Sequence, residues 1–456
     1  MEFQNLTRKV EIGANSYLLR TAGKSLVFDT GMHPKARGLA ATPDFSAIPP
    51  GSVNGIIVTH AHQDHLGSLP VLAQREPQAR VYMTPATAKI AEVMLHNSVN
   101  VMTRQREEHG DEDLPLFTHR GVDRSRAGWQ LCPLGRSFGF DGERCKNDDE
   151  PSFEFFNAGH ILGATGVLIR SEGQRVFYTG DVNFEDQTLV RGAEFPTEGV
   201  DTLIMETTRG DSPTPVGLTR AGEADRLANA IHAAFERGGS VTIPIFALGK
   251  TQEILALIWK MRLEGRLPRV PLYIGGLSTK LTMIYDAMAS DPQRTHPELN
   301  LLKELSPYVL SGRDIFAISP RKACIYAISS GMMTENTLSN FFARRVLSDP
   351  KQSLFFVGYS DPESPAGRIR AAQAGDEIVI ETGQPPLPLR CHIEDFNFSA
   401  HASRESLLNY AIGLRPKKIV LVHGDRPAIE WFQLELHRSL PDTAIIIPEP
   451  GKTITI

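Results

Sequence analysis

The chain has 456 residues, a formal net charge of −5 and 41% hydrophobic residues, an ordinary composition for a soluble globular protein. No apolar run approaches the roughly 18 residues of a membrane-spanning helix, and the first residues lack the pattern of a secretory signal. Four widely separated cysteines form no Cys-x-x-Cys pair, which argues against a zinc ribbon and favours a reducing, cytoplasmic setting. The slightly acidic balance gives no global attraction to polyanions, so any binding of nucleic acid must come from local charge.

Residues up to about 210 form short, β-rich runs that are separated by Gly, Pro, Asn and Asp. Continuous apolar runs of this length predict buried strands, and a Gly-containing turn between two of them predicts a hairpin. The polar and weakly periodic stretch 97–150 predicts helix and long loop. The predicted strands are 25–28, 55–59, 167–170 and 175–178 (the hairpin), and 200–205.

After residue 210 predicted helices and strands alternate, which indicates βαβ units and a mostly parallel sheet. From about residue 377 the β-rich pattern returns, with a strand at 418–422 that runs into His423. The helices are predicted at 219–237 and 250–262, and the strands at 240–246, 271–274, 323–329 and 353–359.

Three histidines and an aspartate are concentrated in the segment His60-Ala61-His62-Gln63-Asp64-His65, directly after a predicted strand. On an extended segment the side chains of His60 and His62 point to the same side, while a turn at Asp64 and His65 directs two more ligands to a second point. A lone histidine is usually structural, but imidazole and carboxylate groups together suit zinc, or less commonly manganese or iron. The cluster therefore predicts a metal site.

This cluster resembles the His-x-His-x-Asp-His motif of the metallo-β-lactamase superfamily. Other motifs follow in that family's order: Asp29 in Phe28-Asp29-Thr30-Gly31, His160 in Ala158-Gly159-His160, and Asp181 in Thr179-Gly180-Asp181. The resemblance implies that Asp29 orients the ligands and that Asp181 bridges two metal ions.

Later motifs resemble those of the β-CASP branch of this superfamily. Glu206 follows a predicted strand as in motif A, His401 in Ser399-Ala400-His401 resembles motif B, and His423 in Val422-His423-Gly424 resembles motif C. The stretches 243–253 and 329–333 resemble segments of the β-CASP cap.

The resemblance implies an α/β protein with the four-layer αβ/βα metallo-β-lactamase fold and an inserted β-CASP α/β cap. The expected division is 1–210 and 386–456 for the metallo-β-lactamase domain, and 211–385 for the cap.

The resemblance also implies two metal ions per chain, zinc first, with manganese or iron as alternatives. The implied ligands are His60, His62 and His160 for one ion, Asp64, His65 and His423 for the other, and Asp181 between them. Water activated by the two ions would attack an RNA phosphodiester. Catalytic roles are assigned to Asp64, Glu206 and His401, of which the last two form a carboxylate–imidazole pair that protonates the leaving oxygen.

Substrate contacts are expected in the cap. Ser329, Ser330 and Gly331 follow a predicted strand and precede a helix that we place near Thr334, so that their amides could face an anion. Arg368 opens another predicted helix. Lys250 stands where the family usually has arginine, which keeps the charge but loses the planar donor fork. The alternative interpretation is a serine-rich helix cap and a solvated arginine face.

The function implied is that of a metal-dependent ribonuclease acting on single-stranded RNA, without a membrane partner and with a homo-oligomer as one possible state. The segment after His423 is too short for the extra C-terminal domain usual in RNase J, and His423 itself favours RNA over DNA by analogy. Endonuclease and 5′ exonuclease activity are both compatible with the motifs. Two alternatives are a non-nucleolytic hydrolase such as a thioesterase, and a non-catalytic RNA-binding subunit, which in this family usually lacks metal ligands.

Overall fold

The structure is a computed structural model that describes residues 1–145, 150–310 and 318–456. These residues form two compact units, each described here by itself. Unit 1 comprises residues 1–186, 190–214 and 401–456, and unit 2 comprises residues 187–189 and 215–400. The limits predicted from motif positions, after residues 210 and 385, stay a prediction.

The first sheet of unit 1 has the strand order β22-β1-β2-β3-β4-β5-β6. Its N-terminal strands pair antiparallel, while β3, β4, β5 and β6 run parallel to one another. The strands are β1 (Glu2–Asn5), β2 (Tyr17–Thr21), β3 (Lys24–Phe28), β4 (Gly55–Ile57), β5 (Arg80–Met83), β6 (Trp129–Leu131) and β22 (Thr453–Thr455).

The second sheet of unit 1 has the order β21-β20-β11-β10-β9-β8-β7. The predicted hairpin is β9 and β10, and β10, β11 and β20 are mutually parallel although β20 comes from the end of the chain. The strands are β7 (Ser137–Gly139), β8 (Ser152–Asn157), β9 (Thr165–Ser171), β10 (Gln174–Tyr178), β11 (Thr202–Glu206), β20 (Lys418–Val422) and β21 (Ala444–Ile446).

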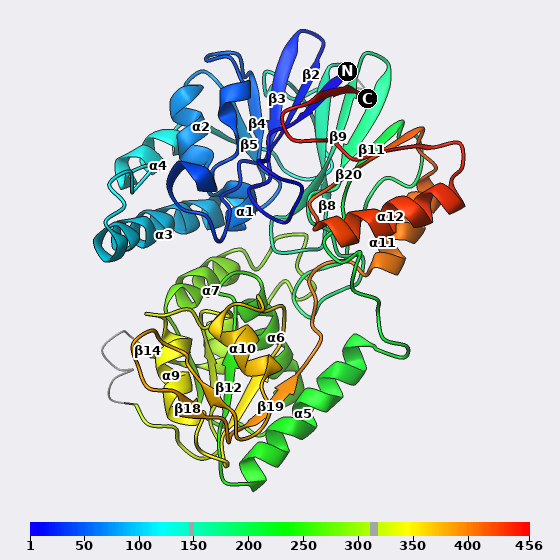
Figure 1. Cartoon of the computed structure of the whole chain (residues 1–456). Helices are drawn as coiled ribbons and strands as arrows, with labels where there is room; N and C mark the ends of the chain where they lie inside the picture. The colour runs from blue at the N-terminus through cyan, green and yellow to red at the C-terminus, as the bar shows by residue number, and fades with distance from the viewer. Residues whose placement is uncertain (146–149, 311–317) are drawn as a thin grey trace. The chain divides into compact units, whose positions relative to one another are not determined.

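The core of unit 1 lies between its two sheets. Along β9, Val167 and Ile169 pack into this core with Phe28 of the first sheet, whereas Leu168 points the other way and packs under two C-terminal helices. Helices α2, α3 and α4 lie beside the first sheet, and α11 and α12 beside the second (Figure 1). This is the four-layer arrangement that was predicted. The helices of unit 1 are α1 (Gln63–Leu66), α2 (Leu69–Arg75), α3 (Pro85–His109), α4 (His119–Arg126), α11 (Arg404–Leu414) and α12 (Arg426–Ser439).

Unit 2 is built on a parallel sheet with the order β14-β13-β15-β12-β16-β19, as the alternation of helices and strands predicts. Its strands are β12 (Val241–Pro244), β13 (Leu272–Gly275), β14 (Tyr308–Leu310), β15 (Ile325–Ile328), β16 (Ser353–Phe356) and β19 (His392–Asp395), with a small pair β17 (Glu377–Ile378) and β18 (Leu387–Pro388). Its helices are α5 (Arg220–Glu236), α6 (Lys250–Leu263), α7 (Leu277–Ala287), α8 (Leu301–Leu305), α9 (Leu338–Val346) and α10 (Pro365–Ala371).

Two local predictions need correction. The helix placed near Thr334 is α9, which begins at Leu338, because the Thr337 side chain accepts the amide of Asn340 and caps the helix there. In the stretch 97–150, the helices α3 and α4 are followed by the short strands β6 and β7, which were not predicted. Residues 146–149 of that stretch lie outside the described residues. Across the described ranges, no helix is long and apolar enough to span a bilayer.

A buried carboxylate in unit 2, that of Glu253, forms hydrogen bonds with the segment 188–189 and with Arg220. Glu253 of α6 accepts the amides of Thr188 and Leu189 at 2.8 and 3.0 Å and a guanidinium N–H of Arg220 at 2.6 Å. Arg220 also donates to the carbonyl of Ser399 at 3.4 Å. Burial raises the pKa of Glu253, but Arg220 and the Thr188 amide outweigh it and hold that pKa below its usual value. We call Glu253 and Arg220 the clamp.

We predict that Arg220→Ala destabilises unit 2, because it leaves the Glu253 carboxylate buried beside two amides with no counter-charge. The expected loss in free energy of unfolding is about 3–5 kcal/mol, measured by urea unfolding. The control is Arg438→Ala, whose guanidinium is 64% exposed and pairs with Glu435 on a helix surface; it should cost about 1 kcal/mol or less. An equal loss in free energy of unfolding for Arg220→Ala and Arg438→Ala would contradict a buried clamp.

Candidate metal centre

The predicted ligands meet at one edge of unit 1 because they follow the carboxyl ends of parallel strands. Such ends converge wherever strands run parallel within a sheet, and loops at this edge bring side chains together. The residues in question are Asp29 after β3, His60 to His65 after β4, Asp181 after β10, Glu206 at the end of β11 and His423 after β20, while His160 lies in the loop between β8 and β9.

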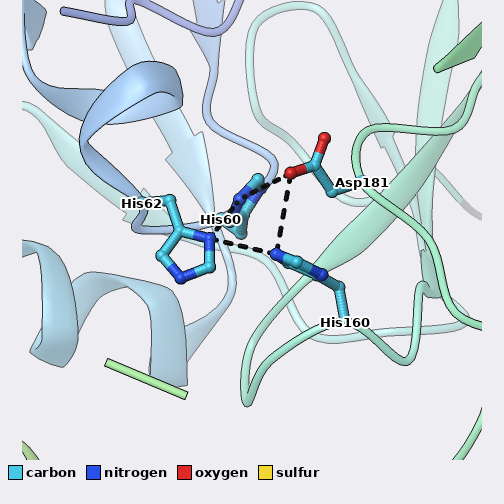
Figure 2. Close-up of side chains that lie close together, drawn as sticks. All are labelled: His60, His62, His160 and Asp181. Carbon is cyan, nitrogen blue, oxygen red and sulfur yellow. Dashed lines mark hydrogen bonds and ion pairs between the residues drawn. The ribbon is translucent and has the colours of Figure 1, made fainter. Parts of the chain in front are cut away.

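Three histidines and Asp181 form a first group (Figure 2). His62 Nδ1 lies 3.2 Å from His60 Nε2 and 3.0 Å from His160 Nε2. Asp181 Oδ2 lies 3.5 Å from His60 Nε2 and 3.6 Å from His160 Nε2. The ligand atoms of a tetrahedral zinc site with bonds of 2.0–2.1 Å are about 3.3 Å apart, so this spacing suits such an ion.

Asp64, His65 and His423 form a second group on the other side of Asp181. Asp181 Oδ1 lies 3.3 Å from His65 Nε2 and 3.2 Å from His423 Nε2. Asp64 Oδ2 is further away, at 3.9 and 3.8 Å from the same nitrogens. The two oxygens of Asp181 therefore face the two groups separately.

The donor set fits a pair of divalent cations. Asp181 Oδ1 is buried and accepts no aligned hydrogen bond among the described residues, although two imidazole nitrogens lie close to it. A buried carboxylate oxygen without a partner is costly unless a cation satisfies it.

Burial raises the pKa of Asp181, but His65 and His423 outweigh it and hold that pKa well below its usual value, so the carboxylate is charged. Burial lowers the pKa of His60, which favours the neutral imidazole that a metal ion needs.

Asp29 contacts the predicted ligand His65 directly and the predicted ligand His60 through Thr59, and it has further partners that the sequence analysis missed. Its carboxylate accepts the Thr59 amide at 2.8 Å, the Thr59 hydroxyl at 3.0 Å, the Tyr178 hydroxyl at 2.8 Å and His65 Nδ1–H at 2.8 Å. The Thr59 oxygen lies 3.1 Å from His60 Nδ1 and can accept its hydrogen. Both imidazoles then keep Nε2 free for the centre.

Gly31 allows the loops around the centre to meet. A Cβ atom on Gly31 would lie 1.8 Å from the carbonyl oxygen of Asp64 and 2.5 Å from the amide nitrogen of Asn15. The Asn15 amide donates to that same Asp64 carbonyl at 2.9 Å, and the Gly31 amide donates to the Asn15 carbonyl at 2.8 Å. Only glycine fits this contact, which holds Asp64 against the N-terminal loop.

Glu206 and His401 lie next to the first group. His401 Nδ1 is 3.4 Å from both Glu206 oxygens, and its ring is 4.5 Å from that of His160. The Val182 amide donates to Glu206 Oε1 at 2.7 Å and fixes the buried carboxylate. Burial lowers the pKa of His401, but Glu206 outweighs it and raises that pKa above its usual value. The spacing of Asp181, Glu206 and His401 would also allow these three residues to hold a metal ion. Metal binding is therefore a second interpretation of the Glu206–His401 pair.

The predicted substrate contacts are only partly brought together. Lys250 and Gly331 line one cavity in unit 2 with Phe246 and Tyr359, and Lys250 Nζ donates to the carbonyl of Phe398. Arg368 instead donates to the carbonyls of Glu363 and Val379 at 2.7 and 3.0 Å.

The two serines are engaged locally. The Ser330 hydroxyl lies 3.3 Å from that of Thr334, and the Ser329 hydroxyl 3.5 Å from the Gly275 carbonyl. With α9 beginning only at Leu338, the amides after β15 do not open a helix as expected.

Family models match three parts of the chain. Residues 11–211 match the metallo-beta-lactamase superfamily, residues 251–369 the Beta-Casp domain, and residues 386–448 the Zn-dependent metallo-hydrolase RNA specificity domain. The chain belongs to the β-CASP branch of the metallo-β-lactamase superfamily. Binding of divalent metal is a property of this family, and the two ligand groups described above could provide it.

Relatives of this β-CASP protein match along almost its whole length. It is 27% identical over 98% of its residues to cleavage and polyadenylation specificity factor subunit 3 of Dictyostelium discoideum, and 28% over 93% to the endoribonuclease ysh1 of Schizosaccharomyces pombe. It spans only 56% and 54% of those two proteins. It is also 26% identical to an RNase J-like protein of Methanocaldococcus jannaschii, with 96% of this chain and 97% of that one covered.

A solved structure supports the fold. The crystal structure of a protein of unknown function from Enterococcus faecalis V583 covers the whole chain with a TM-score of 0.57 at 14% identity.

We predict that the wild-type protein binds two zinc ions per chain and that Asp181→Ala loses at least one, because each oxygen of this carboxylate faces one ligand group. The measurement is metal content by elemental analysis after dialysis against buffered zinc. The control is Asp123→Ala, an exposed aspartate of α4 that should leave the metal content unchanged. Two tightly held ions in Asp181→Ala would contradict the bridging role.

Proposed function

We propose that the chain is a metal-dependent ribonuclease that hydrolyses RNA phosphodiester bonds with two zinc ions. The observation that carries the proposal is the juxtaposition of the predicted ligand set with His401 and the buried carboxylate of Glu206. A purely structural or RNA-binding subunit needs neither the converging ligands nor an acid beside them.

In this proposal His60, His62 and His160 hold one ion, Asp64, His65 and His423 hold the other, and Asp181 lies between them. When bound, the ions would supply a water of lowered pKa and positive charge against the phosphate. Asp29 keeps the imidazoles in the tautomer that presents Nε2, and the Asn15–Asp64 contact keeps Asp64 at the edge of the second group.

The proposed task of His401 is to protonate the leaving oxygen. Hydrolysis that leaves a 5′-phosphate expels a 3′-oxygen, which is a poor leaving group without a proton. His401 is suited to this because Glu206 raises its pKa and directs Nδ1, while the side chain stays 26% exposed toward solvent. Glu206 acts through His401 and is itself held by the Val182 amide.

RNA is the proposed substrate because of the family resemblance. The relatives include an endoribonuclease and an RNase J-like protein, and residues 386–448 match an RNA specificity domain. His423, which belongs to motif C, is present and lies in the second ligand group. Lys250 beside Gly331 is the proposed phosphate contact in unit 2, and Ser329 and Ser330 directly precede Gly331 in the chain.

We predict that the zinc-loaded protein cleaves single-stranded RNA faster than DNA of the same sequence. Binding should weaken as salt rises, because contacts to phosphates release counterions. The assay compares linear RNA, circular RNA, DNA and a thioester; cleavage of the circle assigns endonuclease activity. Equal rates on RNA and DNA would contradict the inference that His423 indicates a preference for RNA. Thioester turnover without RNA cleavage would overturn the proposal.

We predict that His401→Ala hydrolyses RNA about 10²–10⁴ times more slowly while binding metal normally, which is the usual size of a general acid effect. Glu206→Gln should slow the reaction by a smaller factor, because it weakens the orientation and charge of His401 without removing it. The rates are measured in single-turnover digestion, with metal content determined on the same samples.

A substrate with sulfur in place of the bridging 3′-oxygen separates acid catalysis from positioning, because a thiolate leaves without a proton. This substrate should restore most of the rate in His401→Ala but not in Asp181→Ala, which lacks the means of activating water. A His401→Ala defect that stays as large with sulfur would show that His401 is not the acid.

A further inference from the structure

Asn15 is a buried residue in contact with two of the proposed ligands, and no step described above uses its side chain. It lies in the loop before β2, where its backbone is held by Asp64 and Gly31. Its Nδ2 atom is 3.1 Å from His65 Nε2 and 2.6 Å from His423 Nδ1. Its Oδ1 atom accepts the Tyr17 hydroxyl at 3.0 Å. A carboxamide between the two imidazoles of the second group has a direct influence on their hydrogens.

The hydrogen on His65 is placed by Asp29. Because the Asp29 carboxylate can only accept, His65 Nδ1 carries the hydrogen and Nε2 has a lone pair directed at the second group. When this lone pair binds a cation it no longer accepts from Asn15 Nδ2, so His65 then needs no donor from the carboxamide.

Among the described residues, the hydrogen-bond partner of His423 Nδ1 is the carboxamide of Asn15 and not a carboxylate. Its Nε2 faces Asp181 and Asp64, so this nitrogen must lack hydrogen when it binds an ion, and the hydrogen must then sit on Nδ1. With Asn15 Nδ2 at 2.6 Å, two donors would face each other. The carbonyl oxygen of Asn15 must therefore point at His423 Nδ1 whenever Nε2 is a ligand.

A half-turn of the carboxamide makes this possible in the same space. Rotation about the Cβ–Cγ bond exchanges Oδ1 and Nδ2, which have nearly the same size. Tyr17 permits the exchange because a hydroxyl can accept as well as donate.

We propose that Asn15 is a positioning residue for the second cation. Its carbonyl holds the His423 imidazole in the tautomer that leaves Nε2 free. This inference rests on the proposed function, since it assumes that His423 is a ligand. Through Asn15, the loop before β2 would strengthen the binding of the second ion.

The test measures zinc affinity and stoichiometry for the full-length protein in metal-buffered dialysis. Asn15→Ala should keep the first ion and bind the second about 10–100 times more weakly, the usual effect of removing a hydrogen-bond partner of a ligand. Asn15→Asp should restore the second ion, because either carboxylate oxygen accepts the hydrogen of His423 Nδ1. The control is Asn54→Ala, whose side chain accepts the Ser25 amide away from the centre and should leave both affinities unchanged.

A second measurement does not depend on the folding of any variant. Nitrogen NMR of ¹⁵N-histidine in the zinc-loaded wild-type protein should find hydrogen on His423 Nδ1 and none on Nε2. Equal affinity for the second ion in wild type and Asn15→Ala would overturn the inference alone, whereas hydrogen on Nε2 would overturn both the inference and the assignment of His423 as a ligand. A wild-type protein that binds fewer than two ions would overturn the two-ion function itself, and an Asn15→Asp variant that behaves like Asn15→Ala would assign Asn15 a packing role.

Discussion

The centre depends on the hydrogen bonds that the Asp29 carboxylate accepts. Four hydrogens from three residues converge on it, and through them it sets the orientation of His65 and, by way of Thr59, of His60. In this position the backbone of Asp29 adopts the unfavourable left-handed conformation, with φ 57°. His423 has the same unusual backbone, at φ 48°. Such conformations persist only where the surroundings determine them strongly, and they are frequent at functional sites.

The two ligand groups differ in how rigidly they are held. In the first, His60 is fully buried and its hydrogen is placed by a side chain that is itself fixed by Asp29. In the second, His423 has only a carboxamide at Nδ1, and Asp64 is a partly exposed and more distant carboxylate. A centre built in this way would hold its first ion more firmly than its second.

The convergence of the candidate ligands could be predicted because their pattern is local. His60 to His65 identify themselves by spacing, and Asp181, Glu206 and His423 each end a strand that could be predicted from its apolar run. Asn15, Thr59, Tyr17 and Tyr178 could not be found in the same way, since nothing in their own segments marks them. Their roles come from contacts between loops that are far apart in the chain.

The errors in the cap have a similar origin. The start of α9 depends on which threonine caps it, and Thr334 and Thr337 are both suitable in sequence. Arg368 has the composition of an anion-binding residue, but neighbouring carbonyls of its own loop region occupy its guanidinium.

The pairing of β11 with β20 has a consequence for the order in which the protein is made. Glu206 aligns with Val422 across this pair, and residues 215–400 of unit 2 lie between them in the chain. The ribosome therefore completes unit 2 before it synthesises β20. Until then β11, in the middle of the second sheet of unit 1, lacks one of its two neighbouring strands. During that interval the nascent chain already carries His60, His62, His160 and Asp181, but not His423. Contacts of such long sequence separation form late, so the nascent enzyme completes its first ligand group before its second.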